Sequence, residues 1–284
     1  MNFQVRVSPA VVAVVLGLAI VLLVVVDYTL QVIEWNRVGS LQKGYAWVDY
    51  PGGFERPENG PSRTFELIRQ RFDFDRDGPT QTIPTWFSSF QFAFAGLLFL
   101  AVGARTRQLK RGSALPWAFL GLVMFYLSID DTVTIHELLG GDESIGHDLN
   151  EVLGLTFINF DWVVPAAIAV LVLLPFYIPF GLRLPLGTLA LFALAGLIFI
   201  GSQMGIETYS GNWLRSNNID TLAYHRQSLA EDALKLVSEL ILIYGLLAYY
   251  RDNLSGELVR QQRTLLSLVP LGSRPRMSRP SPSS

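Results

Sequence analysis

The stretch PAVVAVVLGLAIVLLVVVDYTL, residues 9–30, is almost entirely apolar. A helix of roughly 20 apolar residues crosses a hydrocarbon core about 30 Å thick, so this stretch predicts a membrane-spanning helix. It is too long for the apolar core of a signal peptide and has no small-residue cleavage pattern, which favours an anchor that remains in the protein. The sequence therefore predicts an integral membrane protein.

Further apolar stretches of similar length follow along the chain. Half of the 284 residues are hydrophobic, and the mean hydropathy of +0.35 is high for a soluble domain. The predicted spans cover about 9–33, 84–104, 115–138, 161–181, 185–207 and 229–250. The predicted fold class is all-α, a polytopic membrane bundle of six helices that forms one domain over residues 9–250.

Basic residues predict the orientation of these spans. The link between the second and third spans carries Arg105, Arg107, Lys110 and Arg111, and no acidic residue lies among them. Short loops rich in Lys and Arg remain in the cytoplasm. We therefore expect both termini to be cytoplasmic: residues 1–8 at the start, and a basic tail over 251–284 that is disordered after about 271. The segment 34–83 then forms a long outer loop between the first two spans.

Composition excludes several classes of function. The chain has no cysteine, which excludes disulfides, thiolate metal sites and a cysteine nucleophile. The net charge of −2 gives no reason to expect a nucleic-acid partner. Membrane lipids are the expected partners, and the sequence leaves protein partners open.

The histidines and many acidic residues gather near the same ends of the predicted spans, which the orientation above places outside. Ionisable groups in or beside a span are costly and indicate function by default. Carboxylates mixed with imidazoles suit zinc, iron or manganese, or a proton path. The candidate metal ligands are Asp130, His136, Glu137, Glu207, His225, Asp232 and Glu239.

Helical geometry tests whether the third-span candidates converge. Asp130 and Glu137 are seven residues apart and point almost the same way on a straight helix. Asp131 and His136 point about 100–120° away, to opposite sides. Asp130 with Glu137 is therefore the predicted inward pair, and His136 contributes only if the helix unwinds. Alternatively, these groups simply meet headgroups and water.

The sixth span allows two readings. Asp232 and Glu239 repeat the seven-residue spacing, and His225 continues that stripe one heptad earlier. However, Glu231, Lys235 and Glu239 also follow one another at four-residue intervals, which favours ion pairs within one helix. The sequence leaves a structural ion-pair ladder and a metal or proton site open.

Glu207 and the loop after the third span supply further candidates. Gly201 and Gly205 form a GxxxG motif, which predicts a close helix approach that would bring Glu207 toward the third and sixth spans. His147 and Glu151 have the spacing of a metal-binding pair on a short helix. Such a pair is more often a solvated loop face.

A different candidate lies in the long loop, where DFDRDG covers residues 73–78. Alternate carboxylates at Asp73, Asp75 and Asp77 match the start of a calcium-binding loop. The match then fails, because Pro84 stands where the loop requires a bidentate glutamate. The alternative to calcium is an acidic surface turn.

Residues 70–140 carry a resemblance to a known family. The chain has an acidic loop, then IPTWFSS at 83–89, then SIDDTVTIHE at 128–137. This succession resembles a family of uncharacterised bacterial multi-pass membrane proteins, in which Asp131 would more often be glutamate. The resemblance implies a location in the bacterial inner (plasma) membrane, and it adds no reaction, because the family has no established activity.

Three functions fit these observations. The first is a metal site whose bound ion could activate water to hydrolyse a lipid-like substrate. The second is a proton or cation pathway in a transporter or carrier subunit. The third is a non-enzymatic assembly or structural subunit with an acidic outer face. The sequence leaves open whether the protein is an enzyme.

Overall fold

The computed structural model describes residues 8–38, 63–74, 82–140, 144–155, 158, 160–210 and 222–255, and these form helices without any strand. The α-helices are α1 (Pro9–Val38), α2 (Arg63–Phe72), α3 (Ile83–Gln108), α4 (Leu115–Val133), α5 (Ile145–Leu153), α6 (Val163–Gly181), α7 (Leu186–Ile200) and α9 (Leu222–Tyr249). Shorter segments are the 3-10 helix η1 (Ile135–Leu139) and the π-helices η2 (Gly201–Ile206) and η3 (Tyr250–Ser255). The all-α prediction is confirmed.

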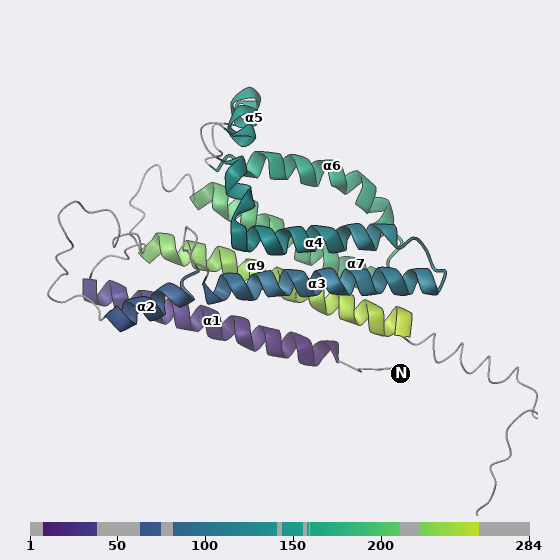
Figure 1. Ribbon diagram of the computed structural model, residues 1–284, viewed down its shortest axis with the longest axis horizontal. Coiled ribbons are helices and arrows are strands. Elements are labelled where there is room, and N and C mark those ends of the chain that lie inside the picture. Colours follow the sequence, from purple (N-terminus) through teal and green to yellow (C-terminus); the bar gives the residue numbers. More distant parts are fainter. Residues whose placement is uncertain are drawn as a thin grey trace, which may run out of the picture.

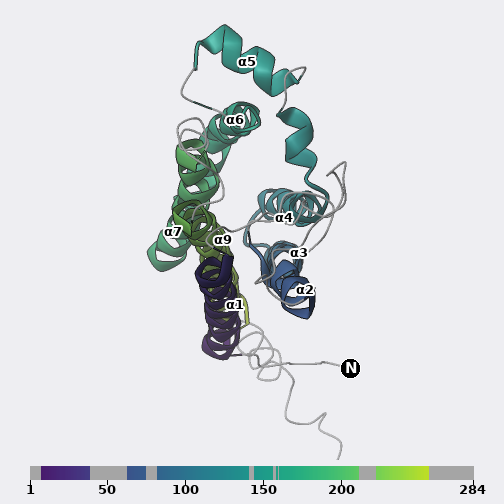
Figure 2. The ribbon, with the colours of Figure 1, turned by 90° about the vertical axis from the view of Figure 1, so that its left-hand side faces the viewer.

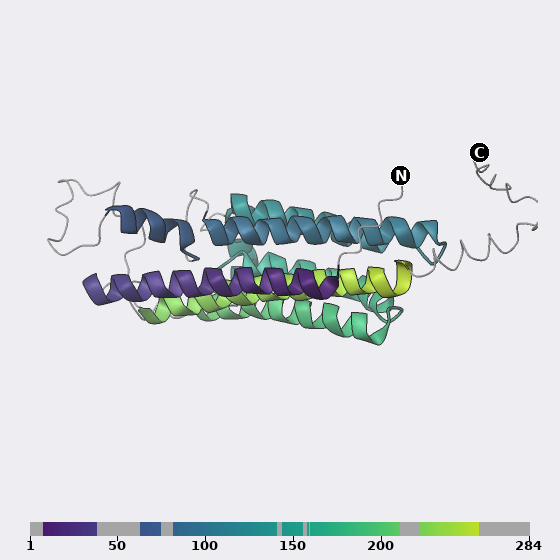
Figure 3. The ribbon, with the colours of Figure 1, turned by 90° about the horizontal axis from the view of Figure 1, so that it is seen from below.

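The long helices lie side by side along one axis (Figures 1 and 3). Five segments are long and apolar enough to cross a membrane: Pro9–Asn36, Ile83–Gln108, Val163–Gly181, Leu186–Ser210 and Leu222–Ser255. They agree with five of the predicted spans, which confirms a polytopic bundle of membrane type. The third predicted span, 115–138, is not among them, so the count of six and the orientation stay predictions.

The third predicted span ends early for a local reason. Helix α4 ends at Val133, and Thr134 adopts a left-handed conformation with φ of 53°. The carboxylate of Asp130 accepts a hydrogen bond of 2.7 Å from the backbone N–H of His136. Because this bond turns the chain back onto α4, residues 135–139 form a separate 3-10 helix. The straight helix assumed for Glu137 does not exist.

Helices α3 and α4 form the closest helix pair. A Cβ atom added to Gly96 would lie 3.1 Å from the carbonyl oxygen of Gly121, and one added to Gly121 would lie 3.1 Å from that of Gly96. The predicted approach at Gly201 and Gly205 is wrong, because no atom of the described residues lies within 4 Å of a Cβ at either position. Small residues thus bring helices together in the middle of α3 and α4 instead.

One end of the bundle has an apolar core. Its buried residues are Ala95, Phe99, Val102, Trp117, Ile243, Leu246 and Leu254. The Trp117 ring lies 4.9 Å from Phe180 and 5.1 Å from Tyr249, measured between centroids. The basic link between α3 and α4 is at this end, where Arg111 donates a hydrogen bond of 2.8 Å to the carbonyl of Asn253.

Candidate functional site

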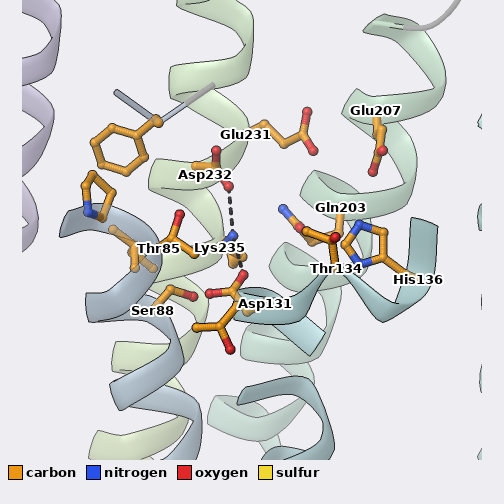
Figure 4. A pocket seen from close by; sticks show the side chains of 14 residues that line it. Thr85, Ser88, Asp131, Thr134, His136, Gln203, Glu207, Glu231, Asp232 and Lys235 are labelled. Atoms are coloured by element: carbon orange, nitrogen blue, oxygen red, sulfur yellow. Dashed lines mark hydrogen bonds and ion pairs between the residues drawn. The ribbon is translucent and has the colours of Figure 1, made fainter. Parts of the chain in front are cut away.

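A polar cavity of about 190 Å³ lies toward the other end of the bundle, among α3, α4, η1, η2 and α9 (Figure 4). Most of its walls are hydroxyl, amide or charged side chains. The lining residues are Phe74, Pro84, Thr85, Ser88, Asp131, Thr132, Thr134, His136, Gln203, Glu207, Glu231, Asp232, Lys235 and Leu236. The cavity has room for about six water molecules.

Lys235 connects two helices at this cavity. Its Nζ lies 2.9 Å from Asp131 Oδ1 on α4 and 2.9 Å from Asp232 Oδ1 on α9. The side chains of Lys235 and Asp131 are each 12 % exposed. Asp131 Oδ2 is also buried, without a hydrogen-bond partner in the described part of the chain. A buried ion pair of this kind is costly to desolvate, so it is weak evidence for a purely stabilising role.

Glu239 extends the charged group one turn deeper. It is 2 % exposed, and its Oε1 accepts a hydrogen bond of 2.8 Å from Ser88 Oγ on α3. Its Oε2 is buried and has no hydrogen-bond partner among the described residues. The Oε2 acceptor of Glu239 is therefore not used by the described residues, and its carboxylate lies next to Ser88, which lines the cavity.

His136 forms a dyad with Asp130 just beyond the end of α4. Its Nδ1 lies 3.0 Å from Asp130 Oδ2, and the same carboxylate binds its backbone N–H. Burial lowers the pKa of His136, but the hydrogen bond to Asp130 and the charges of Asp130, Glu207 and Glu137 outweigh it, so the pKa is raised. The bond to Nδ1 leaves the other ring nitrogen available to the cavity that His136 lines.

Trp162 joins this dyad to Glu207. The indole Nε1 donates a hydrogen bond of 2.9 Å to Glu207 Oε1, and the indole ring lies 4.9 Å from the His136 ring. Trp162 directly precedes α6, and Glu207 directly follows η2. The start of one candidate span thus orients a carboxylate on another.

The backbone around the cavity has two irregularities. Thr134, a β-branched residue, is held at φ of 53° and ψ of 45°, a conformation that is costly for such a side chain. Gln203 belongs to the π-helix η2, and π-helical turns occur frequently at functional sites. Two irregular segments that meet at one polar cavity favour a functional site over a simple structural ion pair.

The structure brings together part of the predicted site. His136, Glu207 and Asp232 line the cavity, together with Glu231 and Lys235 from the predicted ladder. Lys235 bonds with Asp131 and Asp232. The sequence did not predict the bond with Asp131, because it depends on how α4 and α9 are rotated toward each other.

The other predicted ligands lie outside the cavity lining. Asp130 binds His136 from behind, Glu239 lies behind Ser88, and Glu137 and His225 do not line the cavity. Within the described ranges, no group of three or more histidines and acids is placed to hold one metal ion. The predicted metal site therefore stays a prediction.

The predicted loop ligands His147 and Asp73, the latter at the start of the predicted calcium loop, lie outside the cavity lining and contact other residues. His147 Nδ1 lies 3.1 Å from Asp161 Oδ2. Asp73 is 3 % exposed, with Oδ2 lying 3.4 Å from Arg69 Nη1. The other two residues of the predicted calcium loop, Asp75 and Asp77, lie outside the described residues.

A second buried polar group, which sequence reasoning missed, joins α1 to α2. Asp27 and Gln31 are fully buried, and Gln31 Nε2 donates a hydrogen bond of 2.8 Å to Asp27 Oδ2. One turn further, Glu34 pairs with the buried Arg69 of α2. The signal was a polar stripe with helical spacing, 27, 31 and 34, at the end of the most apolar span.

The fold and the cavity define the class of this protein: an all-helical, polytopic membrane-type bundle with a charged cavity toward one end. Its residues 15–250 match the model of a family described as a domain of unknown function, DUF8692. Because this match covers most of the chain, the protein belongs to that family. No curated protein and no solved structure matches the chain.

Proposed function

We propose that this protein is an integral membrane protein whose cavity binds a small cation, and that the preferred cation is a protonated amine. The observation that carries the proposal is the excess of acid at the cavity. Four carboxylates line it, those of Asp131, Glu207, Glu231 and Asp232, against Lys235 and His136. Buried carboxylates are stable only with protons or cations nearby.

The chemistry of the lining favours an amine over a bare metal ion. An ammonium of this chain, that of Lys235, already lies between Asp131 and Asp232. A second ammonium would present N–H donors to the acceptors on the opposite wall, among them Glu207 and Gln203. A metal ion instead requires several ligands converging on one point.

The rest of the bundle supports a binding site that is confined to one end. The apolar core around Trp117 and Leu246 fills the bundle between α3, α4 and α9 on the side of the basic link. A proton or cation pathway across the membrane would need polar groups there. We therefore rank transport below cation binding, and we also rank a purely structural subunit below it. From the basic link we place the cavity at the outer face.

The test is ligand-induced stabilisation of the protein in lipid nanodiscs. Ethylammonium chloride should raise the Tm more than choline chloride, which lacks an N–H, at equal ionic strength. Glu207→Gln should raise the apparent Kd for ethylammonium at least about tenfold, and so reduce the Tm shift, because it removes one charge-assisted hydrogen bond of roughly 1.5–3 kcal/mol. The control is Asp252→Asn, which changes an exposed carboxylate paired with Arg251. Equal effects of both salts, or an unchanged response in Glu207→Gln, would overturn the proposal.

A metal site is the second candidate, and one observation favours it. Histidines that bind metals commonly offer their other ring nitrogen to a carboxylate, as His136 does to Asp130. Glu207 is near enough to raise the pKa of His136 by its charge. Zinc, iron or manganese held there could activate water to hydrolyse a lipid-like substrate.

Elemental analysis of the purified protein separates the two candidates. Stoichiometric metal in the wild type that is lost in His136→Gln would favour the metal site. The amine proposal expects no such metal, and expects MnCl₂ and ZnCl₂ to stabilise the protein less than ethylammonium chloride does.

A further inference from the structure

We infer that α5 is an interfacial helix, which lies in the plane of the membrane and inserts its apolar face among lipids. The helix is short, nine residues from Ile145 to Leu153. Helices of this length are marginal in water without a partner for their apolar face. The identity of the partner follows from the pattern, the position and the orientation of α5.

The pattern of α5 is strictly amphipathic. At 100° per residue, Ile145, Leu149, Val152 and Leu153 fall within an arc of about 100°, and the polar residues occupy the rest of the helix. Three of these four side chains are exposed: Ile145 is 65 %, Val152 82 % and Leu153 53 % exposed, while Leu149 is partly buried. In η1, the neighbouring Leu138 adds another apolar side chain that is 78 % exposed.

Local contacts hold α5 in place. Ser144 caps its start by accepting a hydrogen bond from the backbone N–H of His147, and Gly154, at φ of 65°, ends it. A Cβ atom at Gly146 would clash with the carbonyl oxygen of Leu139, so only glycine allows this approach to η1. The exposed apolar face therefore belongs to a fixed helix.

The position of α5 is set by the start of α6. His147 and Asn150, on the polar face, both bond the carboxylate of Asp161, at 3.1 and 2.6 Å. Two residues later α6 begins its candidate span at Val163. If α6 crosses the membrane, Asp161 lies at the membrane boundary, and α5 lies there with it. Trp162 is an aromatic residue of the type that anchors such boundaries.

The orientation of α5 agrees with this position. Figure 2 views the long helices end-on, whereas α5 is seen along its length, and Figure 1 shows the reverse. Helix α5 therefore runs across the bundle axis, parallel to the membrane plane. Helix α6 also leaves apolar side chains uncovered, because Leu171 and Val172 are 67 % and 57 % exposed. Lipid at the interface is the occupant that fits all these features.

Site-directed spin labelling in nanodiscs tests this inference. Because the chain has no cysteine, Val152→Cys and Glu151→Cys each give one labelled position. Val152 lies within the apolar arc, and Glu151, about 100° away, lies on the polar side of the helix. We expect the Val152 label to collide more with oxygen, which concentrates in lipid, and the Glu151 label more with a water-soluble nickel complex. Leu171→Cys serves as the lipid-facing reference.

Two results would overturn the inference. One is equal access of the nickel complex to both labels, which would place α5 in water. The other is a Val152 label protected from oxygen and nickel alike, which would place a protein surface, such as a second copy of the chain, on the apolar face. Neither result depends on whether the cavity binds a cation.

Discussion

Helices α3 and α9 pass through two contrasting environments. At one end of the bundle their side chains pack around Trp117, with aromatic rings in contact and no charge among the buried core residues. At the other end the same helices hold Ser88, Glu239 and Lys235 around a polar cavity. Both ends contain buried groups, but the buried ion pair of Lys235 with Asp131 lies at the polar end. An apolar replacement of such a pair is often neutral or stabilising, so the pair is weak evidence for a purely stabilising role.

This difference supports the proposal that the polar end carries the function. Between helices in lipid, stability comes from close packing and small residues, and the apolar end has both, as Gly103 approaches Trp117 closely. The polar end combines a left-handed threonine and a π-helix with buried carboxylate oxygens of Asp131 and Glu239 that have no hydrogen-bond partner among the described residues. The apolar end also contains a π-helix, η3, so the buried carboxylates are the feature that distinguishes the polar end. Features of this kind are retained at functional sites although they lower stability.

The largest expected effect is at Lys235. The substitution Lys235→Met would leave Asp131 and Asp232 buried without their cation, and should lower the free energy of unfolding by about 3–5 kcal/mol. A combined Lys235→Met and Asp131→Asn variant should recover part of that loss. Reversible unfolding in mixed micelles measures both.

The matched control is Arg251→Met, which removes a cation whose side chain is 55 % exposed and paired with Asp252. Exposed pairs contribute little, because water and salt screen their charges. If Lys235→Met lowers the free energy of unfolding as little as this control does, the carboxylates around Lys235 are already neutral. The polar end would then carry less buried charge than its side chains suggest, and would differ less from the apolar end.

A smaller loss is expected at the apolar end. Trp117→Ala should cost less than the about 3–5 kcal/mol typical of aqueous cores, because the unfolded helix keeps its apolar surface in lipid and loses mainly packing contacts. The same variant should leave ethylammonium binding unchanged. A parallel loss of binding would show that the two ends are coupled, and that the apolar core is part of the site.

The sequence predicted most of the fold, because a membrane span needs only length and apolar composition, both of which are visible along the chain. It missed the end of α4, because that end depends on a hydrogen bond from the His136 backbone to the Asp130 carboxylate. It also expected a close helix approach at Gly201, whereas the close pair is Gly96 with Gly121.

The site was predicted less completely. Acidic and histidine side chains at one end of the spans indicated where the cavity is. Which of them meet depends on the rotation of each helix about its axis, and the sequence does not contain that rotation explicitly. For this reason Asp131 was assigned no role, whereas His225 was expected to be a ligand but does not line the cavity.

The smallest expected effect concerns pH. The folded-state pKa of His136 is raised above the value of about 6.5 expected in the unfolded chain. The stabilisation by the dyad is therefore fully present below about pH 6.5 and is lost as the pH rises through the folded-state pKa. The Tm of the wild type should exceed that of His136→Gln at pH 6, and the difference should shrink as the pH is raised.

Asp130→Asn provides the control for this pH dependence, because it removes the charge that raises the pKa while keeping an oxygen for the backbone bond. In the Asp130→Asn background, His136→Gln should change the Tm by nearly the same amount at every pH. If the Tm change caused by His136→Gln still depended on pH in the Asp130→Asn background, the pH dependence would be assigned to Glu207, the other acid close to His136. A difference that grew with pH would mean that the neutral imidazole is the form that the site stabilises, as metal binding requires. The pH profile at this end of the bundle therefore also distinguishes an amine site from a metal site.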